Sequence, residues 1–400
     1  MIVRGAVLRE MGLPSPYAES RPLAIEEVEL APPGPGELLV RIRAAGLCHS
    51  DLSVINGSRP RVMPMLLGHE ATGEVVRSEA SGFAVGDTVA FAFVPACGTC
   101  GPCAEGRAAL CEPGAAANTA GTLLSGTRRL TTITPTPGST STAGPASSPF
   151  ASTGSAGSGF TSGVLNHHLG VSGFADHAVV SARSAVKIDP ELPPEIAALF
   201  GCAVMTGVGA VVNTARVQAG QSAVVFGLGG VGLSALLGAA LVGAHPLVAV
   251  DVVPEKLALA RELGATHTID ARSNDVVEQV RAATSGGAQY AIETVGSAAV
   301  LAQAYAATSR GGTTVTVGLP DPSQQLSIPA VSLVAEERTL KGSYLGSAVP
   351  SRDIPRYIAL YQAGRLPVDR LLTSTVRLEN LNEAFDTLAA GTAIRQVLLL

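Results

Sequence analysis

The feature that most constrains the fold is a regular alternation of strand-like and helix-like stretches between residues 204 and 344. Helix-like stretches alternate with the apolar runs "SAVVFG", "PLVAVD", "HTID", "QYAIETVG", "TTVTVGL" and "TLKGSY". One of them, "PEKLALARELG", has Pro254 near its start and Gly264 at its end. Neighbouring parallel strands need a crossover connection, which a helix supplies. We therefore predict an α/β fold with a doubly wound parallel sheet over residues 204–344.

A glycine-rich turn, "FGLGGVG", joins the first of these strands to its helix. Gly227, Gly229 and Gly232 form a G-x-G-x-x-G pattern around Gly230, and Asp251 ends the next strand. Glycines at these positions allow a tight turn and let a pyrophosphate approach the helix N-terminus, while the carboxylate binds the adenosine ribose hydroxyls. An acid there disfavours a 2′-phosphate, so we predict NAD rather than NADP. A Rossmann domain without a nucleotide is the alternative.

Four of the six cysteines lie within one short lobe, residues 95–113, with the spacing C-x2-C-x2-C-x7-C. These are Cys97, Cys100, Cys103 and Cys111. Four thiolates bind zinc tetrahedrally and leave no open position, so such a site is structural. Four unligated thiols in a glycine-rich loop are the alternative.

The other two cysteines, Cys48 and Cys202, are scattered, as are His69 and Glu70 in "GHE". Two thiolates and one imidazole can form a zinc site with an open fourth position. Spacing alone does not establish this site, because Cys48 and Cys202 could be small buried residues and His69 a satisfied core histidine.

Length and composition exclude several classes of protein. Four hundred residues predict two domains, and a net charge of −5 without a Lys/Arg run argues against nucleic-acid binding. The N-terminal stretch "MIVRGAVLREMGLP" has charges within its apolar part, so we do not interpret it as a signal peptide. The most apolar window, "SALLGAALVGAHPLVAV", is broken by Gly, His and Pro, which argues against a membrane span. We expect a cytoplasmic protein whose clustered thiols bind metal.

The rest of the chain divides by composition. Residues 1–130 contain short alternating apolar runs and turn glycines, which predict a β-rich region. Residues 131–163 contain no charged residue and consist almost entirely of Ser, Thr, Gly, Ala and Pro. Such a segment cannot bury enough apolar surface to order itself, so we expect a mobile surface loop. A tolerated insertion is the preferred interpretation, and a cap over the substrate cleft or a block on higher oligomers is the alternative.

Taken together, these motifs give the chain a family resemblance. With the cysteine lobe and the glycine-rich turn, it resembles the zinc-dependent alcohol dehydrogenases of the medium-chain dehydrogenase/reductase superfamily in "GLCHSD", "LLGHEATGEV", "GCAVMTGVGAVVNTA", "ERTLKGSYLGS" and "AIRQVLLL". The resemblance implies a β-rich, GroES-like catalytic domain made of residues 1–203 and 345–400. The NAD-binding Rossmann domain, residues 204–344, would be inserted between them. It also implies two zinc ions per subunit, one catalytic and one structural, and a homodimer.

The resemblance implies a role for each matching residue around the catalytic metal. The zinc ligands would be Cys48, His69 and Cys202. Glu70 matches a carboxylate that can approach the metal during ligand exchange. Asp51 would hydrogen-bond His69 and orient it, and Ser50 would accept the substrate hydroxyl proton.

Five further matches concern the cofactor. His49 and Arg395 match basic residues that contact the pyrophosphate. Asp251 and Lys256 would hold the adenosine ribose, and Thr206 would pack near the nicotinamide. One departure concerns Ser53, because some family members end the proton relay with a histidine at this position. A serine cannot act as the terminal base near pH 7, so protons would leave through water or His49.

The implied activity is oxidation of a primary or aromatic primary alcohol to the aldehyde, and the reverse. Zinc would lower the pKa of the bound alcohol, and the resulting alkoxide would transfer hydride to NAD. One alternative is a thiol-dependent formaldehyde dehydrogenase, which needs a basic group in the cleft that the sequence does not locate. A catalytically silent NAD-binding protein of the lens type is a more remote alternative. The absence of Trp predicts an aliphatic-lined pocket, and His167, His168 and Tyr344 are interpreted as packing residues.

Overall fold

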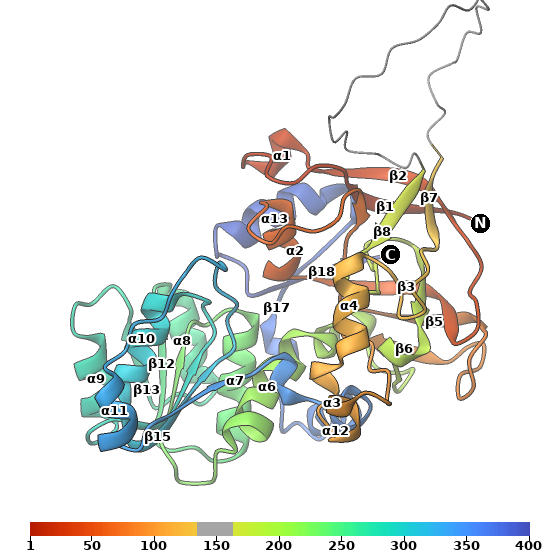
Figure 1. The fold of residues 1–400 in the computed structure, drawn as a ribbon. Coiled ribbons are helices and arrows are strands. Elements are labelled where there is room, and N and C mark those ends of the chain that lie inside the picture. Colours follow the sequence, from red (N-terminus) through yellow and green to blue (C-terminus); the bar gives the residue numbers. More distant parts are fainter. Residues whose placement is uncertain (134–162) are drawn as a thin grey trace, which may run out of the picture.

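The computed structural model describes residues 1–133 and 163–400. These residues form two parts joined side by side, a mostly parallel α/β part and a β-rich part (Figure 1). The predicted loop at 131–163 therefore lies almost entirely outside the described residues. Its first two residues contradict the prediction, because Thr131 and Thr132 belong to strand β7 and pair with Glu29 and Val28 of β2.

The α/β part contains a six-stranded sheet in the order β13-β12-β11-β14-β15-β16, in which every neighbouring pair is parallel. The strands are β11 (Ala223–Phe226), β12 (Leu247–Asp251), β13 (His267–Asp270), β14 (Ala288–Glu293), β15 (Thr308–Thr316) and β16 (Thr339–Gly342). The predicted alternation is thereby confirmed. Because the order reverses between β11 and β14, a crevice opens at the carboxyl ends of these two strands.

Helices connect these strands and cover the sheet (Figure 1). They are α7 (Gly230–Leu241), α8 (Pro254–Glu262), α9 (Val276–Ala283), α10 (Ala298–Ala307) and α11 (Ala330–Ala335). The strands β11 and β12 are buried along their whole length, as expected for a parallel sheet covered on both faces. Their continuous apolar runs, rather than alternating patterns, follow from that burial.

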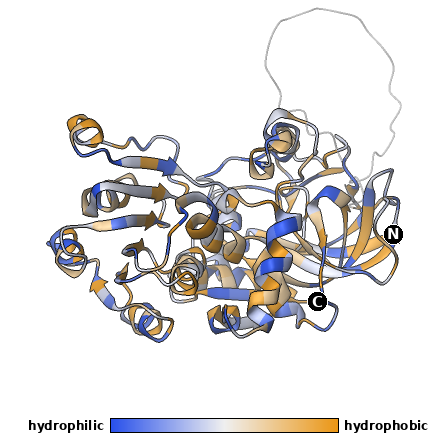
Figure 2. Ribbon diagram, turned by 90° about the horizontal axis from the view of Figure 1, so that it is seen from below, coloured by the Kyte–Doolittle hydropathy of each residue, from blue (hydrophilic) through white to orange (hydrophobic). Residues whose placement is uncertain are grey.

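The β-rich part consists of a closed barrel and a second sheet. The barrel has the order β1-β2-β7-β8-β4, with β1 (Ile2–Leu8), β2 (Leu23–Leu30), β4 (Met65–Leu66), β7 (Leu130–Thr132) and β8 (Val164–His167). The second sheet has the order β10-β6-β5-β3-β18-β17, and β9 also pairs with β3. Its strands are β3 (Glu37–Leu47), β5 (Ala71–Ser78), β6 (Thr88–Phe91), β9 (His177–Ser181), β10 (Ala185–Lys187), β17 (Leu372–Val376) and β18 (Arg395–Leu399). Hydrophobic residues occur on strands and helices throughout the molecule (Figure 2).

Helical segments of varied length connect and flank the sheets of the β-rich part. The α-helices are α1 (Tyr17–Ser20), α2 (His49–Ile55), α3 (Gly101–Ala104), α4 (Glu112–Ala120), α5 (Pro194–Ala197), α12 (Pro350–Gln362) and α13 (Leu381–Ala389). The 3₁₀ turns are η1 (Ala108–Leu110), η2 (Ala182–Ser184), η3 (Ala198–Gly201), η5 (Leu345–Ser347), η6 (Val368–Leu371) and η7 (Leu378–Asn380). Since β17 and β18 follow the α/β part in sequence but join β3, the β-rich part is discontinuous along the chain.

The two parts share a core at the helix α6 (Ala203–Gly209), which continues into the π-helical turn η4 (Ala210–Ala215). One hydrophobic cluster runs from Phe200 through Met205 to Val225 of the parallel sheet. The helix α6 packs tightly on α7, because a Cβ on Gly207 would lie 2.6 Å from the Cβ of Ser234. The packing of α6 on α7 therefore joins the β-rich part to the α/β part.

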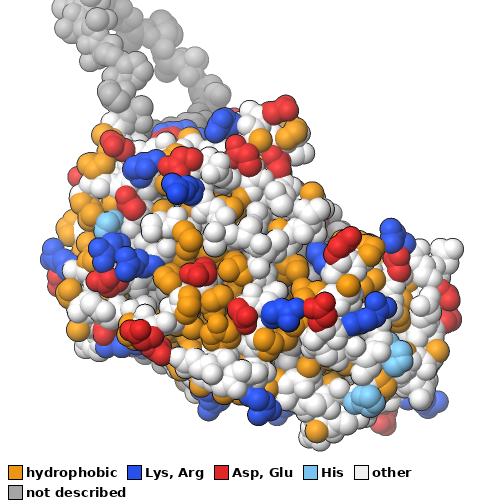
Figure 3. All heavy atoms as spheres, turned by 180° about the vertical axis from the view of Figure 1, so that it is seen from behind, with side chains coloured by type: hydrophobic (Ala, Val, Ile, Leu, Met, Phe, Trp, Pro, Cys, Tyr) orange, Lys and Arg blue, Asp and Glu red, His pale blue; other side chains and the backbone are white. Residues whose placement is uncertain are grey.

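The charged side chains on one face of the molecule do not mark a binding site for a highly charged partner. On the face shown in Figure 3, acidic and basic side chains are interspersed, and neither sign forms a continuous patch. Within the described residues no single helix is long and apolar enough to cross a bilayer. The pair Pro194–Gly201 and Ala203–Ala215 reaches that length and composition only jointly, with a bend of 50° between them.

Candidate functional site

A cleft of about 350 Å³ lies between the two parts and is lined by both. The β-rich part contributes Cys48, Phe93 and Cys202 to its walls, and the α/β part contributes the glycine-rich turn and Asp251. Its position at the carboxyl ends of the parallel strands is where α/β folds bind their ligands.

Four of the predicted metal-site residues meet at the bottom of this cleft. Ligand atoms of Cys48, His69, Glu70 and Cys202 all lie within 4.8 Å of one another, and all four residues are buried. Cys48 lies between β3 and α2, His69 and Glu70 immediately precede β5, and Cys202 lies between η3 and α6. Thus three chain segments that are far apart in sequence bring two thiols and one imidazole together.

Asp51 orients this cluster. Its Oδ1 lies 3.0 Å from Nδ1 of His69, and its Oδ2 accepts a hydrogen bond from the backbone N–H of Cys48 at 3.2 Å. Burial alone would lower the pKa of His69, but the Asp51 carboxylate raises it well above its ordinary value. The Nε2 atom of His69 is buried without a hydrogen-bond partner among the described residues. An imidazole fixed through Nδ1, with Nε2 facing two thiols, fits a zinc ion held by Cys48, His69 and Cys202.

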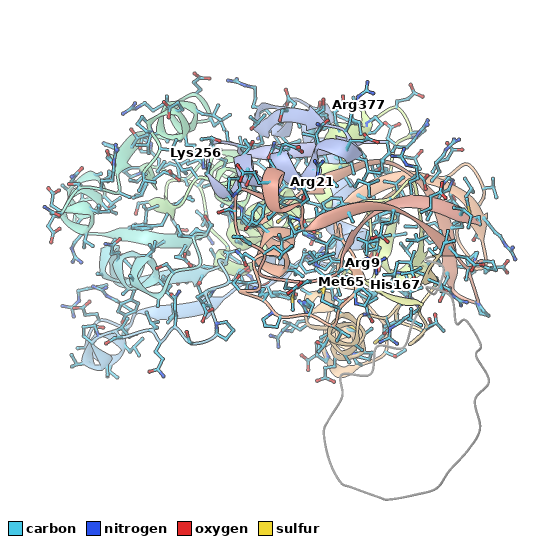
Figure 4. The ribbon with its side chains drawn as sticks, turned by 90° about the horizontal axis from the view of Figure 1, so that it is seen from above. Arg9, Arg21, Met65, His167, Lys256 and Arg377 are labelled. Atoms are coloured by element: carbon cyan, nitrogen blue, oxygen red, sulfur yellow. The ribbon has the colours of Figure 1, made fainter. Side chains whose placement is uncertain are left out.

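His168 was predicted to be a packing residue, and the structure corrects this interpretation. Its Nδ1 lies 3.2 Å from Oδ1 of Asp51, and its ring meets that of His69 edge-on at a centroid distance of 5.5 Å. Burial lowers the pKa of His168 despite the opposing effect of Asp51. His167 behaves as predicted: it lies in β8 opposite Leu66 (Figure 4), and burial lowers its pKa to about 4.

Glu70 and Arg395 form a buried ion pair beside the thiols. Burial raises the pKa of Glu70 to about 7, although the guanidinium of Arg395 lowers it. The resemblance assigned Arg395 to the pyrophosphate. In the structure its side chain is directed to Glu70 and also borders the glycine-rich turn, where a Cβ on Gly230 would overlap its Cδ. Arg395 therefore links the metal cluster to the cofactor side of the cleft.

The predicted proton-transfer residues lie on α2. The Ser50 hydroxyl is 3.8 Å from the Cys48 sulfur, and both His49 and Ser50 line the cleft. The Ser53 hydroxyl donates to the backbone carbonyl of Ser50 at 2.8 Å, so it is not directed at the Ser50 hydroxyl as a relay would require. Desolvation lowers the pKa of His49, and the positive charges of Arg395 and Lys256 lower it further. Cys48 has the opposite effect and raises it.

The glycine-rich turn has the steric features expected of a dinucleotide site. Gly227 has a φ of 86°, which favours glycine. A Cβ on Gly229 would meet no described atom within 4 Å, so this position leaves room for a ligand. A Cβ on Gly232 would overlap the carbonyl oxygen of Gly227, so that position permits close contact between helix and strand.

Asp251 and Lys256 line the cleft from the α/β part, and Lys256 is labelled in Figure 4. Oδ2 of Asp251 accepts the N–H of Leu228 at 2.6 Å, and Oδ1 accepts the N–H of Val253 at 2.9 Å. The carboxylate thus holds the glycine-rich turn as well as facing the cleft. Thr206, on α6, also lines the cleft.

The four lobe cysteines also converge, with ligand atoms all within 4.8 Å of one another. Backbone N–H groups point at their sulfurs: Thr99 donates to Cys97 at 3.4 Å, and Cys97 donates to Cys111 at 3.2 Å. The N–H of Thr99, together with further donors, lowers the pKa of the Cys97 thiol to about 6. Burial has the opposite effect on Cys103 and Cys111, whose pKa values it raises. Four converging thiols with this spacing fit a closed zinc site.

Sequence reasoning did not place Phe93, Tyr344 or Arg59 in the wall of the cleft. Phe93 contacts the ring of His69 edge-on at 5.6 Å between centroids, and Tyr344 contacts Phe93 at 5.8 Å. Both aromatic rings line the cleft together with aliphatic side chains such as Val231, Val317 and Leu345, so the expected aliphatic lining is present but is not complete. Tyr344 packs on Phe93, in agreement with the packing role expected for it. Arg59, in the loop after α2, lines the cleft too. A lone aromatic or arginine in a loop gives no periodic signal from which its position could be predicted.

Comparison with known proteins agrees with this geometry. The family model for the alcohol dehydrogenase GroES-like domain matches residues 34–143, and the model for zinc-binding dehydrogenases matches residues 230–363. Geraniol dehydrogenase of Castellaniella defragrans is 36% identical over 399 residues, which cover 99% of this chain and 97% of that protein. The putative alcohol dehydrogenase D of Mycobacterium tuberculosis is 36% identical over 388 residues, covering 96% and 98% respectively.

Solved structures show the same likeness. The alcohol dehydrogenase zinc-binding domain protein from Burkholderia ambifaria has a TM-score of 0.87 and 34% identity, covering 100% of this chain and 99% of its own. Benzyl alcohol dehydrogenase from Acinetobacter calcoaceticus has a TM-score of 0.86 and 28% identity over the same shares. Fold and site thus define an oxidoreductase with a Rossmann sheet and a GroES-like domain. The chain belongs to the zinc-dependent medium-chain alcohol dehydrogenase family, as the sequence motifs predicted.

Proposed function

We propose that this protein oxidises an alcohol to the aldehyde, and catalyses the reverse reaction, with zinc and NAD. The observation that carries the proposal is the unpartnered, buried Nε2 of His69, which faces Cys48 and Cys202 in the same cleft as the glycine-rich turn. This chemistry requires a metal site formed by an imidazole nitrogen and two thiols, at the base of a cleft that can bind a dinucleotide.

Cys48, His69 and Cys202 would hold the catalytic zinc. Zinc at this position supplies Lewis-acid polarisation of the substrate oxygen. Asp51 accepts a hydrogen bond from the Nδ1–H of His69 and so keeps Nε2 available as a ligand atom. A second zinc ion would be bound by the cysteine lobe, giving two per subunit.

The Ser50 hydroxyl is the group placed to take the proton from a substrate alcohol, because it lies beside Cys48 at the cleft wall. Since the Ser53 hydroxyl donates to the Ser50 carbonyl instead, the proton leaves Ser50 through water or through His49. Because position 53 holds a serine, activity should rise with pH more steeply than in a relative whose relay ends in a histidine, and a flat profile from pH 6 to 9 would contradict this assignment.

The cofactor proposal is NAD rather than NADP, and it rests on Asp251. A buried carboxylate at the end of β12 disfavours a 2′-phosphate by charge repulsion and accepts hydroxyl hydrogen bonds from a ribose. NAD supplies the hydride acceptor, and the glycine-rich turn and α7 hold its pyrophosphate.

For the substrate we propose a primary or aromatic primary alcohol. Phe93 and Tyr344 provide aromatic walls next to His69. Two similar proteins carry the names geraniol dehydrogenase and benzyl alcohol dehydrogenase, and both compounds are primary alcohols.

The test is NADH formation by zinc-loaded protein with a panel of primary, benzylic and secondary alcohols, without added thiol. Turnover with primary or benzylic alcohols is the expected result. Turnover only with formaldehyde plus glutathione would favour the thiol-dependent formaldehyde dehydrogenase, for which Arg59 offers the basic group that the sequence did not locate. Silence on both panels, in protein carrying two zinc ions per subunit, would leave a catalytically silent NAD-binding protein.

We also propose a cytoplasmic homodimer that pairs through the α/β parts. Among the described strands, β16 pairs with β15 alone, which leaves its other edge available. Val331 and Val334 on the adjacent α11 are 71% and 82% exposed. Sedimentation of the purified protein should give a dimer, and Val334→Asp should shift it to a monomer. Val85→Asp, at another highly exposed valine in the β-rich part, is the matched control and should remain dimeric.

A further inference from the structure

Arg59 is a half-buried cation in the wall of the cleft, on the loop between α2 and β4. Its backbone N–H donates to the carbonyl of Ser53, but within the described residues its guanidinium forms neither an ion pair nor a hydrogen bond. The remaining segment, residues 134–162, contains no Asp or Glu. No carboxylate of this chain is therefore available to neutralise Arg59 from that segment either.

The surroundings of Arg59 are positive rather than negative. Burial lowers the pKa of Arg59, and the nearby Arg61 lowers it further, against a weaker opposing effect of Tyr344. Arg61 itself has a buried Nε without a partner among the described residues. An unpaired guanidinium beside a second one is costly to bury, unless a ligand supplies the opposite charge.

Of the other charged residues of the cleft, Asp251 and Arg395 are already engaged, and Lys256 lies on the side of the α/β part. Asp251 accepts two backbone N–H groups on the cofactor side, and Arg395 is paired with Glu70. Lys256, also on the cofactor side, belongs to the first turn of α8. Arg59 is thus the cation that remains for the substrate.

Arg59 also lies at the right end of the cleft for this purpose. Arg59 and Tyr344 line the same cleft, and Tyr344 contacts Phe93, which in turn contacts His69 of the metal cluster. The two aromatic rings therefore form a wall that leads from the metal cluster towards Arg59. A substrate lying along this wall would have its hydroxyl at the metal and its far end near the guanidinium.

We propose that the cleft accepts alcohols that carry a carboxylate at the end remote from the hydroxyl, and that Arg59 binds this carboxylate. The proposal rests on the alcohol dehydrogenase function proposed above. In the reaction, the hydroxyl-bearing carbon is oxidised to an aldehyde, NAD takes up the hydride, and one proton is released, while the carboxylate is unchanged. Arg59 is a specificity residue, because it contacts the substrate away from the reacting atoms.

The test compares two alcohols of similar shape, 4-(hydroxymethyl)benzoate and 4-methylbenzyl alcohol, with zinc-loaded protein and NAD. The variants are Arg59→Gln, Arg59→Lys and the control Arg43→Gln, which removes an exposed guanidinium on β3 that does not line the cleft. A charge-assisted hydrogen bond corresponds to a roughly 10- to 100-fold effect. We expect Arg59→Gln to lower kcat/KM for the carboxylate by that factor, mainly through KM, and to leave the neutral alcohol nearly unchanged.

Arg59→Lys should retain part of the preference, since it keeps the charge, and Arg43→Gln should retain all of it. The preference should also weaken as salt concentration rises. An equal effect of Arg59→Gln on both alcohols, or an unchanged carboxylate KM, would overturn the proposal.

Two further measurements are needed. One distinguishes a free hydroxy acid from a thiol adduct as the carrier of the carboxylate, and the other distinguishes carboxylate binding from alcohol dehydrogenase activity. A series of ω-hydroxyalkanoates of increasing length tests free hydroxy acids, whereas formaldehyde plus glutathione tests a carboxylate carried by a thiol adduct. Calorimetric binding of 4-(hydroxymethyl)benzoate to wild type and Arg59→Gln does not require turnover. Weaker binding by the variant, without NADH formation by either protein, would refute the alcohol dehydrogenase function but support carboxylate recognition by Arg59.

Discussion

The Nδ1 atom of His69 lies 3.0 Å from Oδ1 of Asp51, and both side chains are fully buried. Such a contact fixes the imidazole proton on Nδ1 and aims Nε2 at Cys48 and Cys202. The carboxylate is itself held by the backbone N–H of Cys48, so the acid and two of the ligands form one connected unit.

Asp51→Asn should weaken zinc binding at this cluster and lower activity, each by about 10- to 100-fold, because the amide no longer provides a charged acceptor for the histidine proton. Zinc retained after dialysis against a chelator, together with kcat/KM, measures both effects. Asp353→Asn is a matched control, since Asp353 is equally buried and accepts the N–H of Val349 far from the cluster. Full zinc content in Asp51→Asn would contradict the orienting role.

The cysteine lobe should be separable from the cleft. Cys111→Ser should remove one zinc ion per subunit and lower the thermal midpoint, because the lobe loses a buried ligand and its cross-link. Cys202→Ser should remove the other zinc ion and abolish activity, with a smaller effect on the thermal midpoint. If both variants kept two zinc ions, or Cys111→Ser lost none, the assignment of the lobe would be wrong.

Asp251→Asn should raise KM for NAD about tenfold. It should also reduce the preference for NAD over NADP, because the charge that repels a 2′-phosphate is gone. Steady-state kinetics with both cofactors measure this. Asp270→Asn is the matched control: Asp270 ends the neighbouring strand β13 opposite Asp251 but does not line the cleft. A wild-type protein that prefers NADP would contradict the NAD assignment directly.

Glu37 should make stability depend on pH. It is 2% exposed and accepts hydrogen bonds from the N–H of Gly34, the Ser125 hydroxyl and Nε of Arg129, each at 2.8 Å. Burial, the largest single influence, raises its pKa, but these donors together bring the pKa below its ordinary value. A lowered folded-state pKa stabilises the protein above the unfolded-state value, and this stabilisation is lost as pH falls through the folded-state pKa.

Glu37→Gln should therefore cost about 1–3 kcal/mol of unfolding free energy at neutral pH. The difference from wild type should shrink as the pH falls below the ordinary range of a glutamate. Urea unfolding at neutral and acidic pH measures it. Glu29→Gln, on the exposed face of β2, should change stability little at either pH, and a constant deficit of Glu37→Gln at all pH values would exclude the linkage.

The parallel sheet could be predicted because its signal is local. Each strand is a short apolar run bounded by turn residues, so β13 matches the predicted "HTID" from His267 to Asp270. The cysteine lobe could be predicted equally well, since all four thiols lie in one short stretch of sequence. Cys48, His69 and Cys202 are different: they meet only because β3, the segment before β5 and η3 converge, and no periodicity predicts that. Only the family pattern indicated them.

The errors and omissions share one physical cause, which is that tertiary packing decides the partner of a polar or aromatic side chain. His168 adjoins His167 in an apolar stretch, yet one of the pair contacts Asp51 and the other lies in the barrel. Tyr344 lies where the chain returns to the β-rich part, and only the fold places it against Phe93. Arg395 was assigned to one neighbour, whereas it adjoins both Glu70 and the glycine-rich turn.

Glu70 and Arg395 are 325 positions apart in the chain, and neither has another counter-ion within the described residues. A ribosome synthesising this protein exposes the Glu70 segment long before Arg395 is made. In an incomplete chain the Glu70 carboxylate stays hydrated, and burying it beside the thiols without its partner would be costly. We therefore expect the buried cluster to close only when β18 has paired with β3, after the α/β part has been synthesised.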